Sequence, residues 1–559
     1  MTIRNTIASW SSAALVAGAV YSAPALAGGT VGSLLADAPS TTSTATPDPS
    51  TLPPAGLVPT TKTVAEVLAL YRASAGNVVK PIAVSREVDA VSGQSDSGTE
   101  TIVRSGNDFV TTFRLGRTSA SFGSFHGVRW SHNENGYTRI VSGIHDESML
   151  SARALADALK GTPADSVRLL GEVAKPVEAY VMEVHPQGGL LEWLFIDRAS
   201  GRLVRKEDSG DGTRETYTYD DFRTTDGVVE PWHETYADGS PEDAFDWKTT
   251  SLDDAARLTP GELAIPPSRG PLTFPAAAGD IRLPAMFEDG AIIVHVTIGG
   301  RGLDLQLDSG ASGVVIDADV ASQLGLEKFD TQSDEQSTSH EVSSAIVSEI
   351  QIGPLSMHNV VVQCLPFFYN PDSEHKVVGL LGYDFFAGAV VKVDYVNDTV
   401  DAFDAASFKA PAGPIEKLPI KLDDQIPMID AQLGSGDPGN FVIDTGAQSF
   451  IIFDDFAKQH SNDIAQIGYA DGRKVYYPKE VAQGVGGFFF LQPIQARDFF
   501  IGEEGFQDVR LTQAANFVGE DIDGLVGYPI LQFFDVYFDY ADSTIFLQPN
   551  SILLNEMKQ

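Results

Sequence analysis

Apolar residues in the second half of the chain come in short runs separated by Gly, Asp and Pro. Two such runs, Leu303–Leu307 and Val314–Ile316, enclose a short polar segment, and the same arrangement returns at Phe441–Ile443 and Phe450–Phe453. Short apolar runs bounded by turn residues are typical of buried β-strands. This half is therefore predicted to be all-β, with room for one short helix before the final strands of each part.

Each enclosed segment begins with an acid at a strand end and continues into a glycine turn. The two segments are Asp308-Ser309-Gly310-Ala311 and Asp444-Thr445-Gly446-Ala447. A carboxylate in an apolar frame is unfavourable unless its charge is shared, hydrogen-bonded or used. The similar tripeptides that begin at Asp96 and Asp208 have polar neighbours on both sides, which indicates ordinary turns.

A second pair of segments repeats at a constant spacing. Gly379–Tyr383 matches Gly524–Tyr528, 145 positions later, and Asp394 and Asp539 keep the same spacing. The two acids differ by 444 − 308 = 136, so the second copy has nine more residues between its acid and its apolar-glycine segment. The sequence therefore contains an internal duplication of a unit of roughly 130 residues.

An apolar strand, an Asp-Ser/Thr-Gly-Ala turn and a later apolar-apolar-Gly segment thus occur in order, twice. In this, residues 283–550 resemble two fused retropepsin-like units of the aspartic protease family. The resemblance implies a bilobal, mainly β aspartic protease of two tandem closed β-barrels, at 281–405 and 415–550. It implies that Asp308 and Asp444 are the catalytic residues.

The resemblance also gives roles to neighbouring residues. The acid loops are supported by their own residues Ser309, Gly310, Ala311, Thr445, Gly446 and Ala447. They are braced from behind by Leu380, Leu381, Gly382, Leu525, Val526 and Gly527.

One departure from the family concerns the glycine-rich flap hairpin. The corresponding part of the first copy, Ser333–His340, has no glycine, whereas the second copy has Gly484, Gly486 and Gly487 before Phe488–Phe490. Glycines lower the cost of hinge motion, and phenylalanines offer an apolar cover. The predicted flap is therefore in the second copy; the alternative is a hairpin buried in the second core.

Two carboxylates about 3 Å apart cannot both ionise, so one holds a proton while the other is charged. Such a pair can activate water for attack on a peptide bond, with no metal or other cofactor, and we expect hydrolysis to be faster on the acid side of neutrality. Signatures of zinc, serine and cysteine hydrolases are missing from the sequence. The alternative is a non-catalytic peptide-binding or assembly protein that keeps the fold.

Residues 61–270 have a different pattern. Apolar residues at helical spacing after Thr63 and between Ser148 and Leu159 predict helices, and short alternating runs predict a curved antiparallel sheet, giving an α+β domain. Gly127–Trp130 and Gly201–Val204 resemble segments of the half-barrel sheets of periplasmic lipoprotein carriers. That likeness implies a module for an apolar ligand or peptide; the alternative is a structural or inhibitory companion domain.

The N-terminus reads as an export signal. An apolar run from Ile7 to Val20 precedes Ala25-Leu26-Ala27, which predicts a signal peptide over 1–27, the alternative being a membrane anchor. Residues 28–60 are rich in Ser, Thr, Pro and Ala and are predicted to be a disordered linker.

The cysteine content and the net charge limit the cellular locations and the binding partners expected for the protein. Cys364 is the only cysteine, which fits the bacterial periplasm or the medium better than a disulfide-stapled secreted protein. The net charge of −38 argues against nucleic acid as a partner. We therefore expect an exported monomer that acts on peptides or proteins and has no transmembrane segment once the signal is removed.

Overall fold

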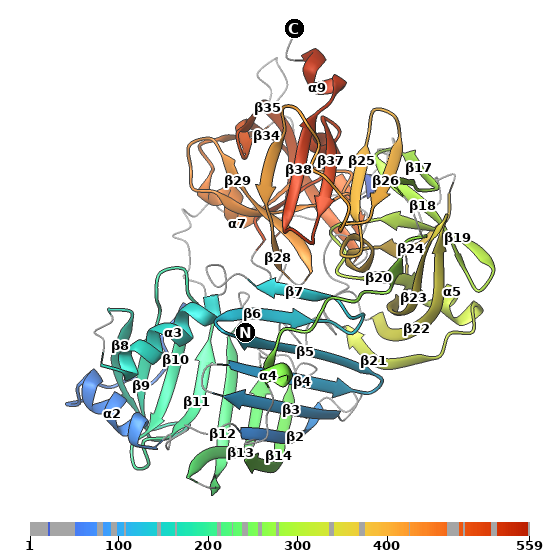
Figure 1. The fold of residues 1–559 in the computed structure, drawn as a ribbon. Helices are drawn as coiled ribbons and strands as arrows, with labels where there is room; N and C mark the ends of the chain where they lie inside the picture. The colour runs from blue at the N-terminus through green and yellow to red at the C-terminus, as the bar shows by residue number, and fades with distance from the viewer. Residues whose placement is uncertain are drawn as a thin grey trace, which may run out of the picture. The chain divides into compact units, whose positions relative to one another are not determined.

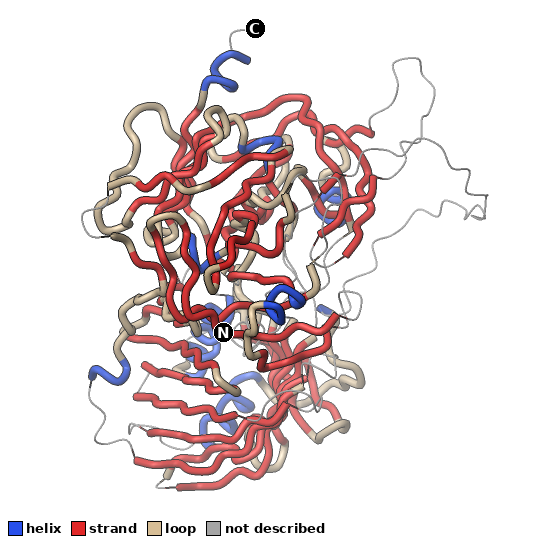
Figure 2. Tube along the Cα trace, turned by 90° about the vertical axis from the view of Figure 1, so that its right-hand side faces the viewer, coloured by secondary structure: helices blue, strands red, loops and turns tan. Residues whose placement is uncertain are grey.

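The computed structural model of the 559-residue chain is mainly β (Figure 2). It describes residues 21–22, 51–74, 82–90, 98–105, 108–141, 147–161, 165–209, 214–225, 227–237, 244–254, 260–275, 279–334, 340–367, 375–423, 425–466, 480–484, 487–515 and 522–556. Of the predicted signal peptide and linker, only Tyr21–Ser22 and residues 51–60 lie within these ranges. No helix of the described part is both long and apolar enough to cross a bilayer.

The chain divides into two compact units, which are described separately. One contains Val78–Asp146 and Asp246–Gln559, and the other contains Ala23–Asn77 and Glu147–Phe245. The predicted 61–270 domain therefore contributes residues to both units.

The smaller unit packs two helices on antiparallel strands. Its elements are α2 (Val64–Ser74), α3 (Glu147–Leu159), β8 (Val167–Val173), β9 (Ala179–Val184), β10 (Glu192–Asp197), β11 (Leu203–Asp208), β12 (Glu215–Thr225) and β13 (Val228–Ala237). Thr63 and Glu66 form a reciprocal capping box at the start of α2. Val58, inside the predicted linker, exchanges backbone hydrogen bonds of 2.9 Å with Glu172.

The larger unit begins with antiparallel strands in the order β7-β6-β5-β4-β3-β2-β14. These are β2 (Ile82–Ala90), β3 (Gly98–Ser105), β4 (Asp108–Leu115), β5 (Thr118–Phe125), β6 (Val128–His132), β7 (Thr138–Val141) and β14 (Phe245–Asp254), followed by α4 (Pro260–Leu263). We call this the N-terminal sheet. Its last turn, Asn133–Tyr137, joins β6 to β7.

The first acid belongs to a sheet that closes on itself. Its strands follow the order β23-β20-β24-β19-β18-β22, and β22 pairs again with β23. The bounds are β15 (Leu272–Thr273), β17 (Ala285–Glu288), β18 (Ala291–Ile298), β19 (Arg301–Leu307), β20 (Val314–Asp317), β21 (Lys328–Asp334), β22 (His340–Ile352), β23 (Leu355–Leu365) and β24 (Val377–Leu381).

The second acid belongs to a sheet with the matching order β35-β31-β36-β30-β29-β34, closed by pairing of β34 with β35. Its strands are β28 (Lys421–Asp423), β29 (Ile426–Leu433), β30 (Gly439–Ile443), β31 (Ile451–Phe453), β32 (Ile464–Gln466), β33 (Glu480–Gly484), β34 (Gly487–Ile501), β35 (Glu504–Ala514) and β36 (Gly524–Val526). The short strand β1 (Tyr21–Ser22) pairs with β33.

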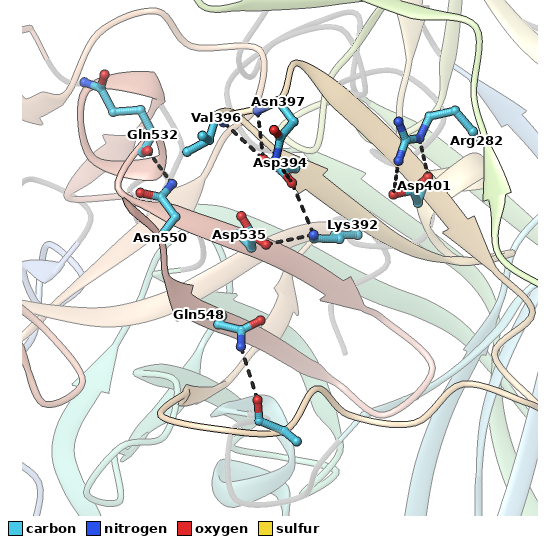
Figure 3. Close-up of polar contacts among 11 residues, drawn as sticks. Arg282, Lys392, Asp394, Val396, Asn397, Asp401, Gln532, Asp535, Gln548 and Asn550 are labelled. Atoms are coloured by element: carbon cyan, nitrogen blue, oxygen red, sulfur yellow. Dashed lines mark hydrogen bonds and ion pairs between the residues drawn. The ribbon is translucent and has the colours of Figure 1, made fainter. Parts of the chain in front are cut away.

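A six-stranded sheet joins the two halves, in the order β16-β26-β25-β37-β38-β27 (Figure 1). Its strands are β16 (Ile281–Arg282), β25 (Val390–Asp394), β26 (Thr399–Phe403), β27 (Glu416–Pro419), β37 (Phe534–Asp539) and β38 (Thr544–Pro549). Figure 3 shows Lys392 of β25 reaching Asp535 of β37, with Nζ 2.7 Å from the carboxylate. Strands from before and after residue 410 are therefore hydrogen-bonded into one sheet.

The short helix predicted before the final strands is confirmed in each half, as α6 (Tyr383–Phe386) and α8 (Tyr528–Leu531). Each half also has a helix that the sequence reading did not include, α5 (Ala318–Gln323) and α7 (Asp454–Gln459), directly after the strand that follows the acid. Asp317 caps α5 by accepting backbone hydrogen bonds from Asp319 and Val320. The last described element is α9 (Ser551–Glu556).

Candidate active site

Both acids lie where a strand ends beside a parallel neighbour. Strand β19 stops at Leu307 and pairs with β24, and β30 stops at Ile443 and pairs with β36. The backbone N–H of Asp308 donates to the carbonyl of Leu381 at 3.1 Å, and that of Asp444 donates to Val526 at 3.0 Å. The bracing segments thus extend each ladder to the acid itself. Both aspartates are completely buried.

The glycine turns use their own backbone to hold the carboxylates. The N–H of Gly310 donates to Oδ1 of Asp308 at 2.9 Å, and the N–H of Gly446 donates to Oδ1 of Asp444 at 2.7 Å. In each loop one carboxylate oxygen is therefore fixed, while Oδ2 is buried and receives no hydrogen bond from an N–H or hydroxyl donor in the described structure.

Four hydrogen bonds tie one loop to the other through Ser309 and Thr445. The Ser309 hydroxyl donates to the carbonyl of Ile443 at 2.7 Å and accepts from the Thr445 N–H at 3.0 Å. The Thr445 hydroxyl donates to the carbonyl of Leu307 at 2.9 Å and accepts from the Ser309 N–H at 3.0 Å. We call this set the loop grip. It is reciprocal and buried, so it fixes the two acid loops relative to each other.

Gly446 is required by the closeness of the loops. A Cβ atom at this position would lie 2.5 Å from Cγ and Oδ2 of Asp308, inside any allowed contact. The side-chain amide of Gln306, two residues before Asp308, donates to the carbonyl of Gly446 at 3.0 Å. The second loop therefore crosses directly over the first acid.

The bracing glycines serve the same purpose from behind. A Cβ at Gly382 would lie 2.3 Å from the carbonyl oxygen of Gly313, and one at Gly527 would lie 2.3 Å from that of Ala447. The residues that follow them, Tyr383 and Tyr528, donate their N–H groups to the carbonyls of Ala311 and Ala447 at 2.9 Å. The other bracing residues, Leu380, Leu381, Leu525 and Val526, are buried.

Burial and mutual repulsion change the acidity of the pair. Burial, then the charge of Asp444 and a hydrogen bond between the two carboxyl groups, raise the pKa of Asp308 well above its usual value. Burial raises the pKa of Asp444 to about 7, against the lowering effect of backbone donors and of the same carboxyl–carboxyl hydrogen bond. That bond needs a proton, since two carboxylates have no donor between them. The geometry therefore favours a pair that holds one proton.

The two aspartates differ in pKa, so each has a preferred protonation state. Asp308 keeps its proton, and Asp444 is the partner that ionises near neutrality. The raised pKa of Asp444 moves formation of the singly protonated pair toward neutral pH, because desolvation disfavours the charged carboxylate and the sequence does not show burial. The faster hydrolysis on the acid side that the sequence led us to expect stays a prediction.

The predicted flap corresponds to the hairpin of β33 and β34, in which Gly484 pairs with Gly487. Gly486 lies outside the described residues. The first copy has a hairpin in the matching place, where Asp334 of β21 pairs with His340 of β22. Each half thus forms a hairpin there, with or without glycine.

Two residues at the site escaped the sequence reading. Gln306 is completely buried although it takes a polar position in the alternating pattern of Leu303–Leu307, so the sequence pattern gave no sign of its burial. Tyr540 lies against the first loop, with its hydroxyl 3.4 Å from the carbonyl of Ser309. The sequence feature that could have identified Tyr540 is the 145-residue repeat, which pairs it with Tyr395.

Asp394 and Asp539 recur for a structural reason. Asp394 accepts backbone hydrogen bonds from Val396 and Asn397, and Asp539 accepts one from Asp542. Both acids therefore satisfy turns near the last strands.

Comparison with known proteins gives one family match. Residues 294–385, which include the first acid loop and its bracing segment, match the model of the aspartyl protease family. The comparison with curated proteins found no match.

Several solved structures are similar over parts of the chain. An aspartic proteinase from Irpex lacteus is 15% identical, with 49% of this chain and 98% of that one covered and a TM-score of 0.32. A retropepsin-like aspartic protease from Rickettsia conorii is 18% identical, covering 22% and 90%, with a TM-score of 0.17. A LolA superfamily protein from Nitrosomonas europaea is 14% identical, covering 36% and 98%, with a TM-score of 0.27. At such low scores these likenesses add nothing to what the site residues indicate; the match at 294–385 relates the first acid loop to the aspartyl proteases.

Proposed function

We propose that the chain is an aspartic endopeptidase in which Asp308 and Asp444 form one catalytic pair. The observation that carries this proposal is the loop grip, which holds the two acid loops so close together that a Cβ at Gly446 would lie 2.5 Å from the Asp308 carboxyl group. A protein without use for the pair would gain stability by replacing either buried acid with a neutral residue.

The pKa values of Asp308 and Asp444 indicate which of them acts as the acid and which as the base in hydrolysis. Asp444, ionised, accepts a proton from a water molecule, and Asp308, protonated, donates a hydrogen bond to the substrate carbonyl oxygen. The resulting hydroxide adds to the carbonyl carbon, and Asp308 transfers its proton to that oxygen. The proton held by Asp444 then goes to the leaving amine as the C–N bond breaks, and one hydroxyl of the diol intermediate returns its proton to Asp308, which restores both acids.

The finer architecture is part of this proposal: two tandem retropepsin-like units, 281–405 and 415–550, that supply one acid each within a monomer. The matching strand orders of the two closed sheets support it. The antiparallel pairing of β25 with β37 supports an internal rather than an intermolecular pair, since it joins the two halves of one chain.

Further features of the proposal rest on the sequence. They are export to the periplasm or medium behind a signal peptide at 1–27, a peptide or protein substrate, and a flap at Gly484–Gly487. The 61–270 region is proposed to be a companion domain that accompanies the protease units.

One observation favours the second candidate, a non-catalytic peptide-binding protein. Both acids have no exposed surface in the full chain, so a substrate carbonyl reaches them only after the covering segments move. Catalysis therefore requires an opening step that peptide binding elsewhere on the fold does not.

The test is hydrolysis of an unfolded protein by the purified chain and by the variants D308N, D444N and D430N. Asp430 is an exposed acid on β29 and serves as the matched control. We expect D430N to retain activity and both other variants to lose it while remaining folded. We also expect specific activity to be independent of dilution. Activity that survives in either D308N or D444N would overturn the proposal.

A further inference from the structure

The turn Asn133–Tyr137 of the N-terminal sheet, which we call the docking loop, is held in shape by its own side chain. The Asn133 carboxamide oxygen accepts from the N–H of Tyr137 at 2.9 Å, and the N–H of Asn133 donates to the carbonyl of Tyr137 at 3.0 Å. A loop closed in this way presents a fixed surface.

That surface contacts both halves of the protease region. Asn135 forms two hydrogen bonds with the backbone of Val361 in β23, at 2.8 and 3.0 Å. The Asn133 amide donates to Gln425, just before β29, at 2.9 Å. Tyr137 is buried in the same apolar core as the barrel residues and meets the ring of Tyr383 edge-on, with centroids 6.0 Å apart.

Two carboxyl groups, those of Glu134 and Asp384, lie at this contact and interact electrostatically. Asp384, at the second position of α6, is almost completely buried and accepts a hydrogen bond from the Asn133 amide at 3.4 Å. Glu134 of the docking loop has a buried Oε2 atom with no hydrogen-bond partner in the described structure. The other charged or titratable groups that face them are Tyr137, Tyr383 and Arg139, and the Arg139 guanidinium donates to the carbonyl of Leu422.

Asp384 also touches the loop that carries the first acid. Its side chain accepts a hydrogen bond from the backbone N–H of Val314, and its Oδ2 lies 3.3 Å from where a Cβ of Gly313 would be. The preceding residue, Tyr383, donates to the carbonyl of Ala311. A displacement of Asp384 is therefore transmitted to residues 311–314.

The duplication provides an internal comparison. In the 145-residue repeat, Tyr383 corresponds to Tyr528, so Asp384 corresponds to Pro529. The second half builds the same bracing turn and short helix without an acid there. The fold of a half does not need the carboxyl group, which points to a role particular to the half that receives the docking loop.

We infer that Glu134 and Asp384 form an acid-dependent latch: the docking loop is held tightly on the protease region when at least one of these carboxyl groups is protonated, and is loosened when both are charged. This inference does not depend on the proposed catalytic function. It assigns to the N-terminal sheet the task of supporting the first acid loop.

The direction of the pH response follows from the two carboxyl groups. Burial, then the charge of Glu134, raises the pKa of Asp384 to about 8, and burial raises the pKa of Glu134. A carboxyl group with a raised pKa in the folded state binds its proton more tightly there than in the unlatched chain. The latch is thus complete below the ordinary carboxyl pKa and weakens as the pH rises toward 8.

The experiment is backbone hydrogen exchange at pH 5.5 and pH 8, corrected for intrinsic rates, in the full chain and in E134Q, D384N and the control E349Q. Glu349 is an exposed acid on β22. In the wild type, we expect protection of residues 128–141 to fall by about tenfold or more between the two pH values, since one pKa unit corresponds to a factor of ten. In E134Q this loss should be largely abolished, and E349Q should behave as the wild type.

The comparison of E134Q with the wild type isolates the latch, because Asp444, whose pKa is raised to about 7, also changes charge in this range but is intact in both proteins. D384N should likewise keep the protection of residues 128–141 at pH 8. If D384N fails to fold, E134Q alone tests the inference, because Glu134 lies on a partly exposed turn where the substitution disturbs the fold less. Protection of 128–141 that is equal at both pH values in the wild type, or lost equally in E134Q, overturns the inference. Exchange does not report hydrolysis, so a chain without peptidase activity would still show the latch.

Discussion

Removing one hydroxyl of the loop grip is the most direct way to test what holds the two acids together. Thr445→Val keeps the shape of the side chain and deletes both of its hydrogen bonds, to the carbonyl of Leu307 and from the N–H of Ser309. Both groups are in a fully buried region, so water cannot replace the lost partner without rearrangement.

The magnitude follows from the number of orphaned groups. Each buried donor or acceptor left without a partner costs about 1–3 kcal/mol, so T445V should lower the free energy of unfolding by about 2–6 kcal/mol. Ser309→Ala orphans the carbonyl of Ile443 and the N–H of Thr445, and should cost a similar amount. T445S keeps the hydroxyl and loses only a methyl group, which should cost about 1 kcal/mol.

The assay is urea denaturation of the single variants and of S309A/T445V. Since the four bonds tie the same two loops, loosening one side should reduce the effect of loosening the other. The double variant should therefore cost about 0.5–3 kcal/mol less than the sum. Strict additivity, or a T445V effect no larger than that of T445S, would refute the view that the grip acts as one unit.

Three other predictions concern the same region. The rate of hydrolysis should rise with pH through about 7, because Asp444, whose pKa is about 7, must lose its proton while Asp308 keeps its own. A pH–rate profile whose acid limb lies near the ordinary carboxyl pKa would contradict this prediction. Lys392→Met should lower the free energy of unfolding by about 1–2 kcal/mol, since it removes the partly buried cation that pairs with Asp535 of the other half. The double variant K392M/D535N should recover part of this loss, as measured by thermal or urea unfolding. Gly487→Val should reduce turnover of a peptide substrate more than it reduces the unfolding midpoint, and an unfolded variant would instead support a buried hairpin.

The acid loops could be predicted from the sequence because their requirements are local. An acid at the end of an apolar run, a glycine directly after it and an apolar-glycine segment at a fixed distance are all visible in the letters around Asp308 and Asp444. The structure brings these segments together, with each acid's N–H bonded to its bracing strand.

The rest of the site depends on contacts that no local pattern encodes. Gln306 reaches Gly446 across 140 positions, and Asn133 reaches Asp384 across 251. The pKa directions depend on complete burial of the pair, which in turn depends on everything packed over it. The division of the 61–270 region between two units is likewise a consequence of long-range packing.

A duplicated unit starts with two equivalent acids, and a symmetric pair has no reason to place its single proton on one side. In this chain the two loops differ in small ways, Ser309 against Thr445 and Asp384 against Pro529, and the hydrogen bond between the carboxyl groups raises the pKa of Asp308 while it lowers that of Asp444. Fusion of two halves in one chain permits such divergence, because each loop then has its own surroundings. The docking loop meets Asp384, beside the loop that carries Asp308, so the proposed latch would add a further difference between the surroundings of the two acid loops.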